Sequence, residues 1–157
     1  MNWKKYLLLC NEIAKESVAK GNTPFGALII DEEGNILLKQ GNVELTEQKA
    51  TGHAETQIVE RASQMYSKDF LHKCTLVTSV EPCVMCSGAT YWANIGRVVF
   101  GLLETDLLAL TGDNEINPTL NLSCREVFRH GQKDIEVIGP FEDLKEELIK
   151  VHKDYWR

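Results

Sequence analysis

A strand-forming run that leads directly into a helix start is the feature that most constrains the fold of this chain. Residues 74–80, Cys-Thr-Leu-Val-Thr-Ser-Val, are rich in β-branched and apolar side chains, which is typical of a strand in the middle of a sheet. Pro82 suits the first position of a helix, where its missing N–H costs nothing. We therefore expect a helix from about Cys83 to Asn94 and a further strand over residues 97–101.

The flanking segments predict helices on both faces of a mixed sheet. Helical spacing of apolar side chains predicts helices over residues 2–20 and 53–65, and residues 25–30 and 36–39 form a predicted hairpin. Residues 41–52 and 102–121 are interpreted as loops. The remaining elements are expected to be a helix from Cys124 to His130, a strand over residues 135–138 and a helix from Phe141 to Trp156. This order predicts an α/β fold with a mixed sheet of about five strands in a single domain over residues 1–157.

Composition narrows the class of protein and its partners. The chain has 157 residues, with 17 Lys plus Arg against 23 Asp plus Glu and a formal net charge of −6. This acidic balance disfavours nucleic acid as a partner, because phosphate backbones attract basic surfaces. No apolar run reaches the length of a membrane span or signal-peptide core, so we expect no membrane segment. The five cysteines are an odd number in a chain large enough to fold without disulfides, which predicts reduced thiols and a cytoplasmic location.

Two short segments carry residues suited to metal chemistry. His53 stands at the start of one predicted helix, and Cys83 and Cys86 lie three residues apart at the start of another. Free N–H groups and partial positive charge at a helix start stabilise thiolates, the form of cysteine that binds metal. One imidazole and two sulfurs make a zinc site with three protein ligands, which leaves the fourth tetrahedral position for water. An open position of this kind is typical of a catalytic zinc.

Glu55 is the candidate catalytic residue beside this centre. It lies two residues after His53, where its carboxylate can face the bound water without coordinating the ion. Zinc lowers the pKa of bound water to roughly 7, so that hydroxide is available at neutral pH. A neighbouring carboxylate can take the proton from the water and deliver it to a ring nitrogen and then to a departing amine. These groups suit hydrolytic deamination of an aromatic amidine.

The pattern His53-x-Glu55 followed by Pro82-Cys83-x-x-Cys86 resembles the signature of the cytidine deaminase superfamily. Within that superfamily, Pro-Phe-Gly-Ala at residues 24–27, Gly-Asn at residues 41–42 and the run over residues 81–93 are similar to bacterial guanine deaminases. The similarity is clear over residues 22–101. It implies the three-layer α-β-α fold of that superfamily.

The resemblance also implies roles for individual residues. His53, Cys83 and Cys86 would hold one Zn²⁺ per chain, and Glu55 would transfer protons. Substrate contacts would come from side chains and backbone groups alike: the Asn42 amide, the Phe25 and Trp92 rings, the Ala54 N–H, the Glu81 C=O and a C-terminal tail containing Tyr155 and Trp156. Proteins of this type are usually homodimers. The implied function is zinc-dependent deamination of a free nucleobase, guanine or a related aminopurine, with release of ammonia.

Several alternatives remain open at this stage. Residues 49–52 and 107–124 differ from the family pattern in loops that select the substrate, so cytosine deamination and adenosine deamination in transfer RNA are rival activities. A closed zinc knot in a non-enzymatic interaction module is the structural rival, with the ligands Cys83, Cys86, Cys124 and His130. Glu104 and Asp106 follow a strand end, where they could contact a purine or face water. His72 and His152 are assigned to solvent-facing or helix-end positions.

Overall fold

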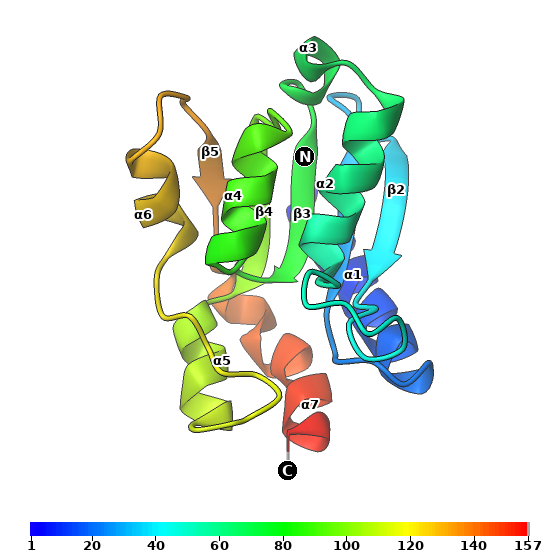
Figure 1. The fold of residues 1–157 in the computed structure, drawn as a ribbon, viewed down its shortest axis with the longest axis vertical. Helices are drawn as coiled ribbons and strands as arrows, with labels where there is room; N and C mark the ends of the chain where they lie inside the picture. The colour runs from blue at the N-terminus through cyan, green and yellow to red at the C-terminus, as the bar shows by residue number, and fades with distance from the viewer. Residues whose placement is uncertain (157) are drawn as a thin grey trace.

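A computed structural model describes residues 1–156 and shows a five-stranded mixed sheet between two layers of helices (Figure 1). The strands are β1 (Gly26–Ile30), β2 (Ile36–Gly41), β3 (Thr75–Val80), β4 (Arg97–Leu102) and β5 (Glu136–Ile138). Their order in the sheet is β2-β1-β3-β4-β5. β1 pairs antiparallel with both β2 and β3, whereas β3, β4 and β5 run parallel. The predicted α/β class and mixed sheet are therefore confirmed.

The central strands are buried on both faces, which is why their sequences are apolar rather than alternating. In β1, Ala27 and Ile29 face one core, and Leu28 and Ile30 face the other. All five residues of β1 and all six of β3 are buried. Each fully buried Leu or Ile contributes roughly 1.5–3 kcal/mol relative to an exposed side chain. Burial of β1 and β3 therefore fixes the centre of the sheet, and the helices that carry the candidate site begin at its edge.

The helices divide between the two faces. One face is covered by α2 (Ala54–Met65), α4 (Val84–Trp92) and α6 (Cys124–Arg129), with the short α3 (Lys68–Leu71) after α2. The other face is covered by α1 (Trp3–Ala19) and α7 (Lys145–Tyr155), which follows a 3-10 turn over Glu142–Leu144. No helix in the part of the chain described here combines the length and apolar character that a bilayer crossing requires.

One segment predicted as a loop is helical. α5 (Glu104–Thr111) lies inside the stretch 102–121, so the loop prediction was wrong for these residues. The Asp106 carboxylate accepts the N–H of Leu103, and Lys145 of α7 forms an ion pair with Asp106 at 3.1 Å. Leu107 is fully buried against the core that α7 completes. Tertiary contacts with α7 therefore support a helix whose own sequence pattern is weak. α3 was also not predicted; it begins after Ser67, whose hydroxyl accepts the N–H of Phe70.

Candidate metal centre and substrate cavity

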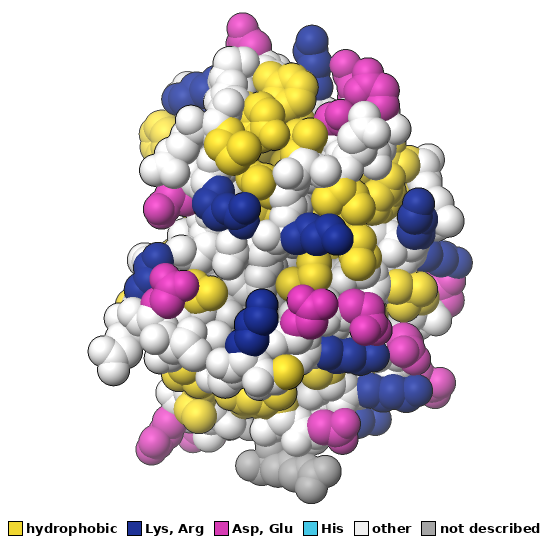
Figure 2. Space-filling model, turned by 90° about the vertical axis from the view of Figure 1, so that its right-hand side faces the viewer, with side chains coloured by type: hydrophobic (Ala, Val, Ile, Leu, Met, Phe, Trp, Pro, Cys, Tyr) yellow, Lys and Arg dark blue, Asp and Glu magenta, His cyan; other side chains and the backbone are white. Residues whose placement is uncertain are grey.

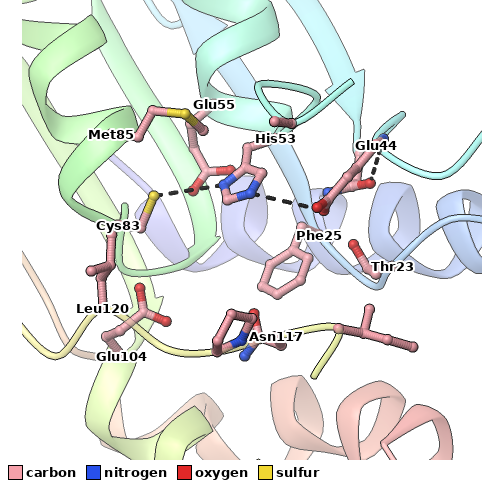
Figure 3. A pocket seen from close by; sticks show the side chains of 14 residues that line it. Thr23, Phe25, Glu44, His53, Glu55, Cys83, Met85, Glu104, Asn117 and Leu120 are labelled. Carbon is pink, nitrogen blue, oxygen red and sulfur yellow. Dashed lines mark hydrogen bonds and ion pairs between the residues drawn. The ribbon is translucent and has the colours of Figure 1, made fainter. Parts of the chain in front are cut away.

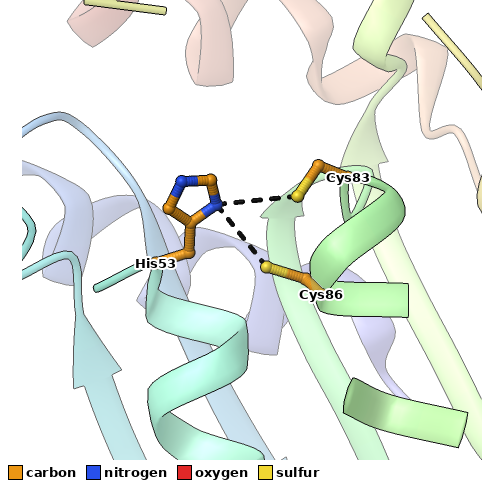
Figure 4. A group of neighbouring side chains, drawn as sticks. All are labelled: His53, Cys83 and Cys86. Carbon is orange, nitrogen blue, oxygen red and sulfur yellow. Dashed lines mark hydrogen bonds between the residues drawn. The ribbon is translucent and has the colours of Figure 1, made fainter. Parts of the chain in front are cut away.

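The candidate metal centre lies where α2 and α4 begin, and its three donor atoms converge. His53 directly precedes α2, Cys83 directly precedes α4, and Cys86 lies in the first turn of α4. The Nδ1 atom of His53 is 3.6 Å from the Sγ atoms of both cysteines (Figure 4). Tetrahedral zinc with ordinary Zn–N and Zn–S bonds separates its nitrogen and sulfur ligands by about 3.6 Å. The donor set therefore fits zinc in both chemistry and spacing.

The environment favours the thiolate form at Cys83, whereas hydrogen bonding with Cys83 and burial raise the pKa of the Cys86 thiol. Hydrogen bonding with Cys86, together with His53, lowers the pKa of the Cys83 thiol to about 4. Cys86 is fully buried, and its sulfur accepts a hydrogen bond from the Thr56 hydroxyl of α2 at 3.1 Å. Hydrogen bonds to ligand atoms orient them and tune metal affinity. Thr56 is thus a supporting contact that links the helix carrying His53 to a sulfur ligand.

The closed zinc knot is contradicted by the placement of its other two ligands. Cys124 is buried at the start of α6, where its N–H donates to the Glu81 carboxylate. His130 is exposed, and its Nδ1 shares a hydrogen bond with the Glu126 carbonyl. Within residues 1–156, the cluster of candidate ligands around His53 includes neither of them. This hypothesis was wrong, and three protein ligands leave room for a fourth, non-protein ligand.

Glu55 faces the cavity from the first turn of α2. Its side chain is 5% exposed, and the carboxyl group lies beside His53 and Cys83 (Figure 3). Burial, and then the negative charge of Cys83, raise the pKa of Glu55 to about 7. A carboxyl group in this range can both accept and donate a proton near neutral pH. The placement matches the proton-transfer role expected for this residue.

A cavity of about 250 Å³ opens in front of these groups. Six segments build it: the lead into β1, the loop after β2, the starts of α2, α4 and α5, and the α5–α6 loop, which we define as residues 112–123. Its lining residues are Thr23, Phe25, Asn42, Glu44, Ala50, His53, Glu55, Cys83, Met85, Glu104, Ile116, Asn117, Pro118 and Leu120 (Figure 3).

Asn42 and Phe25 lie on the cavity wall. Asn42 is 3% exposed, and its side-chain oxygen accepts the N–H of Glu44 at 2.9 Å. Because this bond holds the oxygen, the amide NH₂ group is left to donate toward a ligand. The Phe25 ring packs edge-on against His152, with the ring centroids 5.3 Å apart. The wall therefore combines one fixed hydrogen-bond donor with one supported aromatic ring.

Two tryptophans do not line this cavity, in contrast to the prediction for each. Trp92 is 72% exposed at the end of α4, where its ring meets Tyr91 edge-on. Trp156 is buried behind Phe25, with the ring centroids 6.5 Å apart, and its Nε1 donates to His152 Nδ1 at 3.1 Å. His152 is 1% exposed in the last turn of α7, so it occupies the helix-end position that was one of its two expected places and does not face solvent. Trp156 and His152 form a second layer that supports the Phe25 wall.

The structure places two other predicted contacts beside the centre. Ala54 is fully buried between His53 and Glu55 as the first residue of α2. Glu81 is 4% exposed, and its carboxylate accepts hydrogen bonds from residues at the starts of α5 and α6. The Ala54 N–H and Glu81 C=O as substrate contacts stay predictions.

Several cavity residues were missed or left open by the sequence. Glu104 is 7% exposed, and burial together with nearby acidic groups raises the pKa of its carboxyl to about 8. Asp106, named with it, instead pairs with Lys145. Thr23 and Glu44 gave no sequence signal, because neither belongs to a recognisable motif. The α5–α6 loop lies in the segment that departs from the family pattern, and that departure was the available signal for its place in the cavity wall.

Comparison with known proteins identifies the family. Residues 1–102 match the family model for the cytidine and deoxycytidylate deaminase zinc-binding region, a span that holds the whole metal centre and Glu55. The chain belongs to this deaminase family. It is therefore a hydrolase acting on C–N bonds, with zinc as its cofactor and His53, Cys83 and Cys86 as the group that could bind it.

Individual deaminases resemble the chain over different lengths. A probable cytosine deaminase from Schizosaccharomyces pombe is 36% identical over 151 residues, which cover 96% of this chain and 90% of the relative. Guanine deaminase from Bacillus subtilis is 37% identical over 107 residues, or 68% of each chain. The structure of a guanine deaminase from Nitrosomonas europaea has a TM-score of 0.75 at 23% identity and covers 96% of this chain and 82% of its own. The last similarity shows a shared fold.

Proposed function

We propose that this deaminase acts on a free nucleobase, with guanine or a related aminopurine as substrate. The observation that carries the proposal is a small cavity in which the metal ligands, the Glu55 carboxyl and the Asn42 amide face one space. His53, Cys83 and Cys86 would hold the zinc ion, which would make water available as a nucleophile at neutral pH.

Glu55 moves the protons of the reaction. Water adds across the C=N bond next to the amine; its oxygen joins the ring carbon, and Glu55 carries one of its protons to the ring nitrogen. The C–N bond to the exocyclic amine then breaks, and the proton left on the added oxygen passes through Glu55 to the amine, which leaves as ammonia. The products are the oxo base and ammonia, so water is the only co-reactant. The position of Glu55 at the metal centre suits both transfers.

The cavity favours an uncharged base over a nucleotide. Its volume of about 250 Å³ is below the range of roughly 300–1,000 Å³ that is usual for larger ligands. Glu44, Glu55 and Glu104 contribute three carboxyl groups to the wall, and no described lining residue is Lys or Arg. A substrate phosphate would meet acidic groups without a cation to balance it. Free bases avoid this cost.

The polar groups fit the edges of an aminopurine. Guanine presents a ring carbonyl, which can accept a hydrogen bond from the Asn42 amide, and ring N–H groups, which can donate to a carboxyl oxygen of Glu104. Glu104 is a second buried carboxyl group beyond the one that transfers protons. It supports a substrate with more N–H donors than a pyrimidine presents.

Cytosine is the second candidate. The similarity to a probable cytosine deaminase extends over 96% of this chain and includes the α5–α6 loop region, whereas the similarity to guanine deaminase covers 68%. Cytosine also has a ring carbonyl for Asn42. The two bases therefore have to be separated by assay.

Transfer RNA is disfavoured as a substrate by charge. The formal net charge is −6. Figure 2 shows acidic and basic side chains interspersed with separate apolar patches on the side of the molecule at the right of Figure 1. A polyanion favours a continuous basic face, which that side does not present.

We also propose a homodimer that uses the exposed end of α4. Trp92 is 72% exposed and borders a shallow apolar groove between α2 and α4 that includes Val59 and Ala89. A large aromatic side chain in this position suits burial against a second copy of the chain.

The substrate test is ammonia release from guanine, adenine, cytosine, cytidine, deoxycytidylate and a transfer-RNA anticodon hairpin. We expect turnover of guanine; turnover of cytosine alone would favour the second candidate, and turnover of the hairpin alone would overturn the free-base proposal. The matched variant is Glu55→Gln, which should keep one zinc per chain and lose roughly 10²–10⁴-fold in turnover. Loss of zinc in this variant would contradict a purely proton-transferring role.

A further inference from the structure

The carboxylate of Glu81 connects three parts of the site that are far apart in sequence. Its Oε1 atom accepts the N–H of Glu104 at 3.1 Å, at the first residue of α5. Its Oε2 atom accepts the hydroxyl of Ser123 at 3.0 Å and the N–H of Cys124 at 3.2 Å, where α6 begins. The side chain is 4% exposed, so water competes little for these bonds.

The two anchored helix starts bracket the substrate-facing wall. α5 carries Glu104, and the α5–α6 loop contributes Ile116, Asn117, Pro118 and Leu120 to the cavity. Within that loop, Asn114 bonds only locally, since its side chain accepts the N–H groups of Ile116 and Asn117. The Glu81 carboxylate fixes the position of α5 and of the loop's far end relative to the rest of the site.

Glu81 is also only two residues before the metal ligand Cys83. We propose that the Glu81 carboxylate is a positioning residue: it holds α5 and the α5–α6 loop at a set distance from the metal centre and so determines which base the cavity accepts. This inference rests on the proposed function for the identity of the substrate. The three hydrogen bonds accepted by the Glu81 carboxylate, which we call the Glu81 clamp, are a property of the folded chain and do not depend on the substrate.

The arrangement requires a carboxylate. Three donors point at two oxygens, and both oxygens act as acceptors. Glutamine has one acceptor oxygen, and its NH₂ group would oppose an N–H donor in either orientation. Glu81→Gln therefore breaks the clamp on one side while conserving the size of the side chain.

The experiment compares wild type, Glu81→Gln and Ser123→Ala by amide hydrogen exchange and by steady-state kinetics with guanine and cytosine. For Glu81→Gln we expect amide exchange at Glu104 or Cys124 to accelerate at least tenfold. We also expect KM to rise tenfold or more, with a smaller change in kcat and a shifted guanine-to-cytosine ratio of kcat/KM. Zinc should remain at one per chain. Ser123→Ala, which removes one donor of three, should cause a smaller change in the same direction, and Ser123→Thr should restore wild-type behaviour.

Two outcomes would overturn the proposal that the Glu81 carboxylate positions the cavity wall. Unchanged exchange and unchanged KM in Glu81→Gln would show that the carboxylate does not hold the wall, and loss of zinc would show that it serves the metal loop instead. If Glu81→Gln does not fold, the exchange rate of the Cys124 amide in Ser123→Ala decides the question. If wild type releases ammonia from neither base, the proposed function fails while the exchange measurement still tests the clamp.

Discussion

Acid should destabilise this protein through a single buried histidine, His152. Its side chain is 1% exposed, and burial lowers its pKa from the ordinary 6.5 to about 4. Its Nδ1 accepts the Trp156 indole N–H, and its Nε2 has no hydrogen-bond partner among residues 1–156. A proton added to the ring would therefore remove the acceptor for Trp156 and place an unpaired charge in the second layer behind Phe25.

The magnitude follows from the two pKa values. Between about pH 6.5 and pH 4 the unfolded chain binds the proton and the folded chain does not, so stability falls as the pH falls. From about pH 7.5 to about pH 5, this group alone should cost the folded state about 2 kcal/mol. The free energy of unfolding, measured in urea at several pH values, gives the size of the loss.

Two variants separate the contribution of His152 to the pH dependence of stability from the contribution of the candidate metal ligands, which also titrate. His152→Asn keeps an acceptor for the Trp156 indole but cannot be protonated in this range, so its stability should fall by about 2 kcal/mol less than that of wild type over the same interval. His130→Asn makes the same change at an exposed site and should follow the wild-type profile. Parallel stability profiles for wild type and His152→Asn over this interval would show that protonation of His152 does not destabilise the folded state.

Three further predictions concern the metal centre, the cavity and the surface. Thr56→Val removes the hydroxyl that donates to Cys86 and should weaken zinc binding roughly 10- to 100-fold in competition with a chelator, whereas Thr56→Ser should bind as wild type does; equal affinity of all three would exclude this contact. Asn42→Ala should raise the KM for guanine about tenfold through loss of one donor, with zinc content unchanged, and an unaltered KM would remove Asn42 from substrate recognition. Trp92→Lys should give a monomer in light scattering if the α2–α4 face is the dimer interface, and a persistent dimer would place the interface elsewhere.

Much of the fold was predictable because its signals are local. The β-branched run over β3, the hairpin of β1 and β2, and the starts of α2 and α4 all lie within short stretches of sequence. α5 was missed because its support comes from outside the helix, through Lys145 and the core around Leu107. A weak local pattern cannot reveal a helix that depends on partners about 40 residues away.

In the candidate site, too, local motifs were predictable and contacts between distant segments were not. The spacing of His53, Cys83 and Cys86 pointed to the candidate metal centre, and His53-x-Glu55 pointed to the carboxyl group proposed to transfer protons, because each motif is a contiguous segment at a helix start. Trp92 and Trp156 were assigned to the cavity from resemblance, yet one lies on the surface and the other lies behind Phe25.

Residue types and their spacing were enough to indicate the deaminase family, the candidate zinc ligands and every strand and helix except α3 and α5, because these signals lie within short stretches of sequence. The burial of His152 and the hydrogen bonds by which the Glu81 carboxylate joins α5 and α6 became evident only from the folded chain. Burial and long-range hydrogen bonds depend on which distant segments pack together, and no single stretch of sequence contains that information.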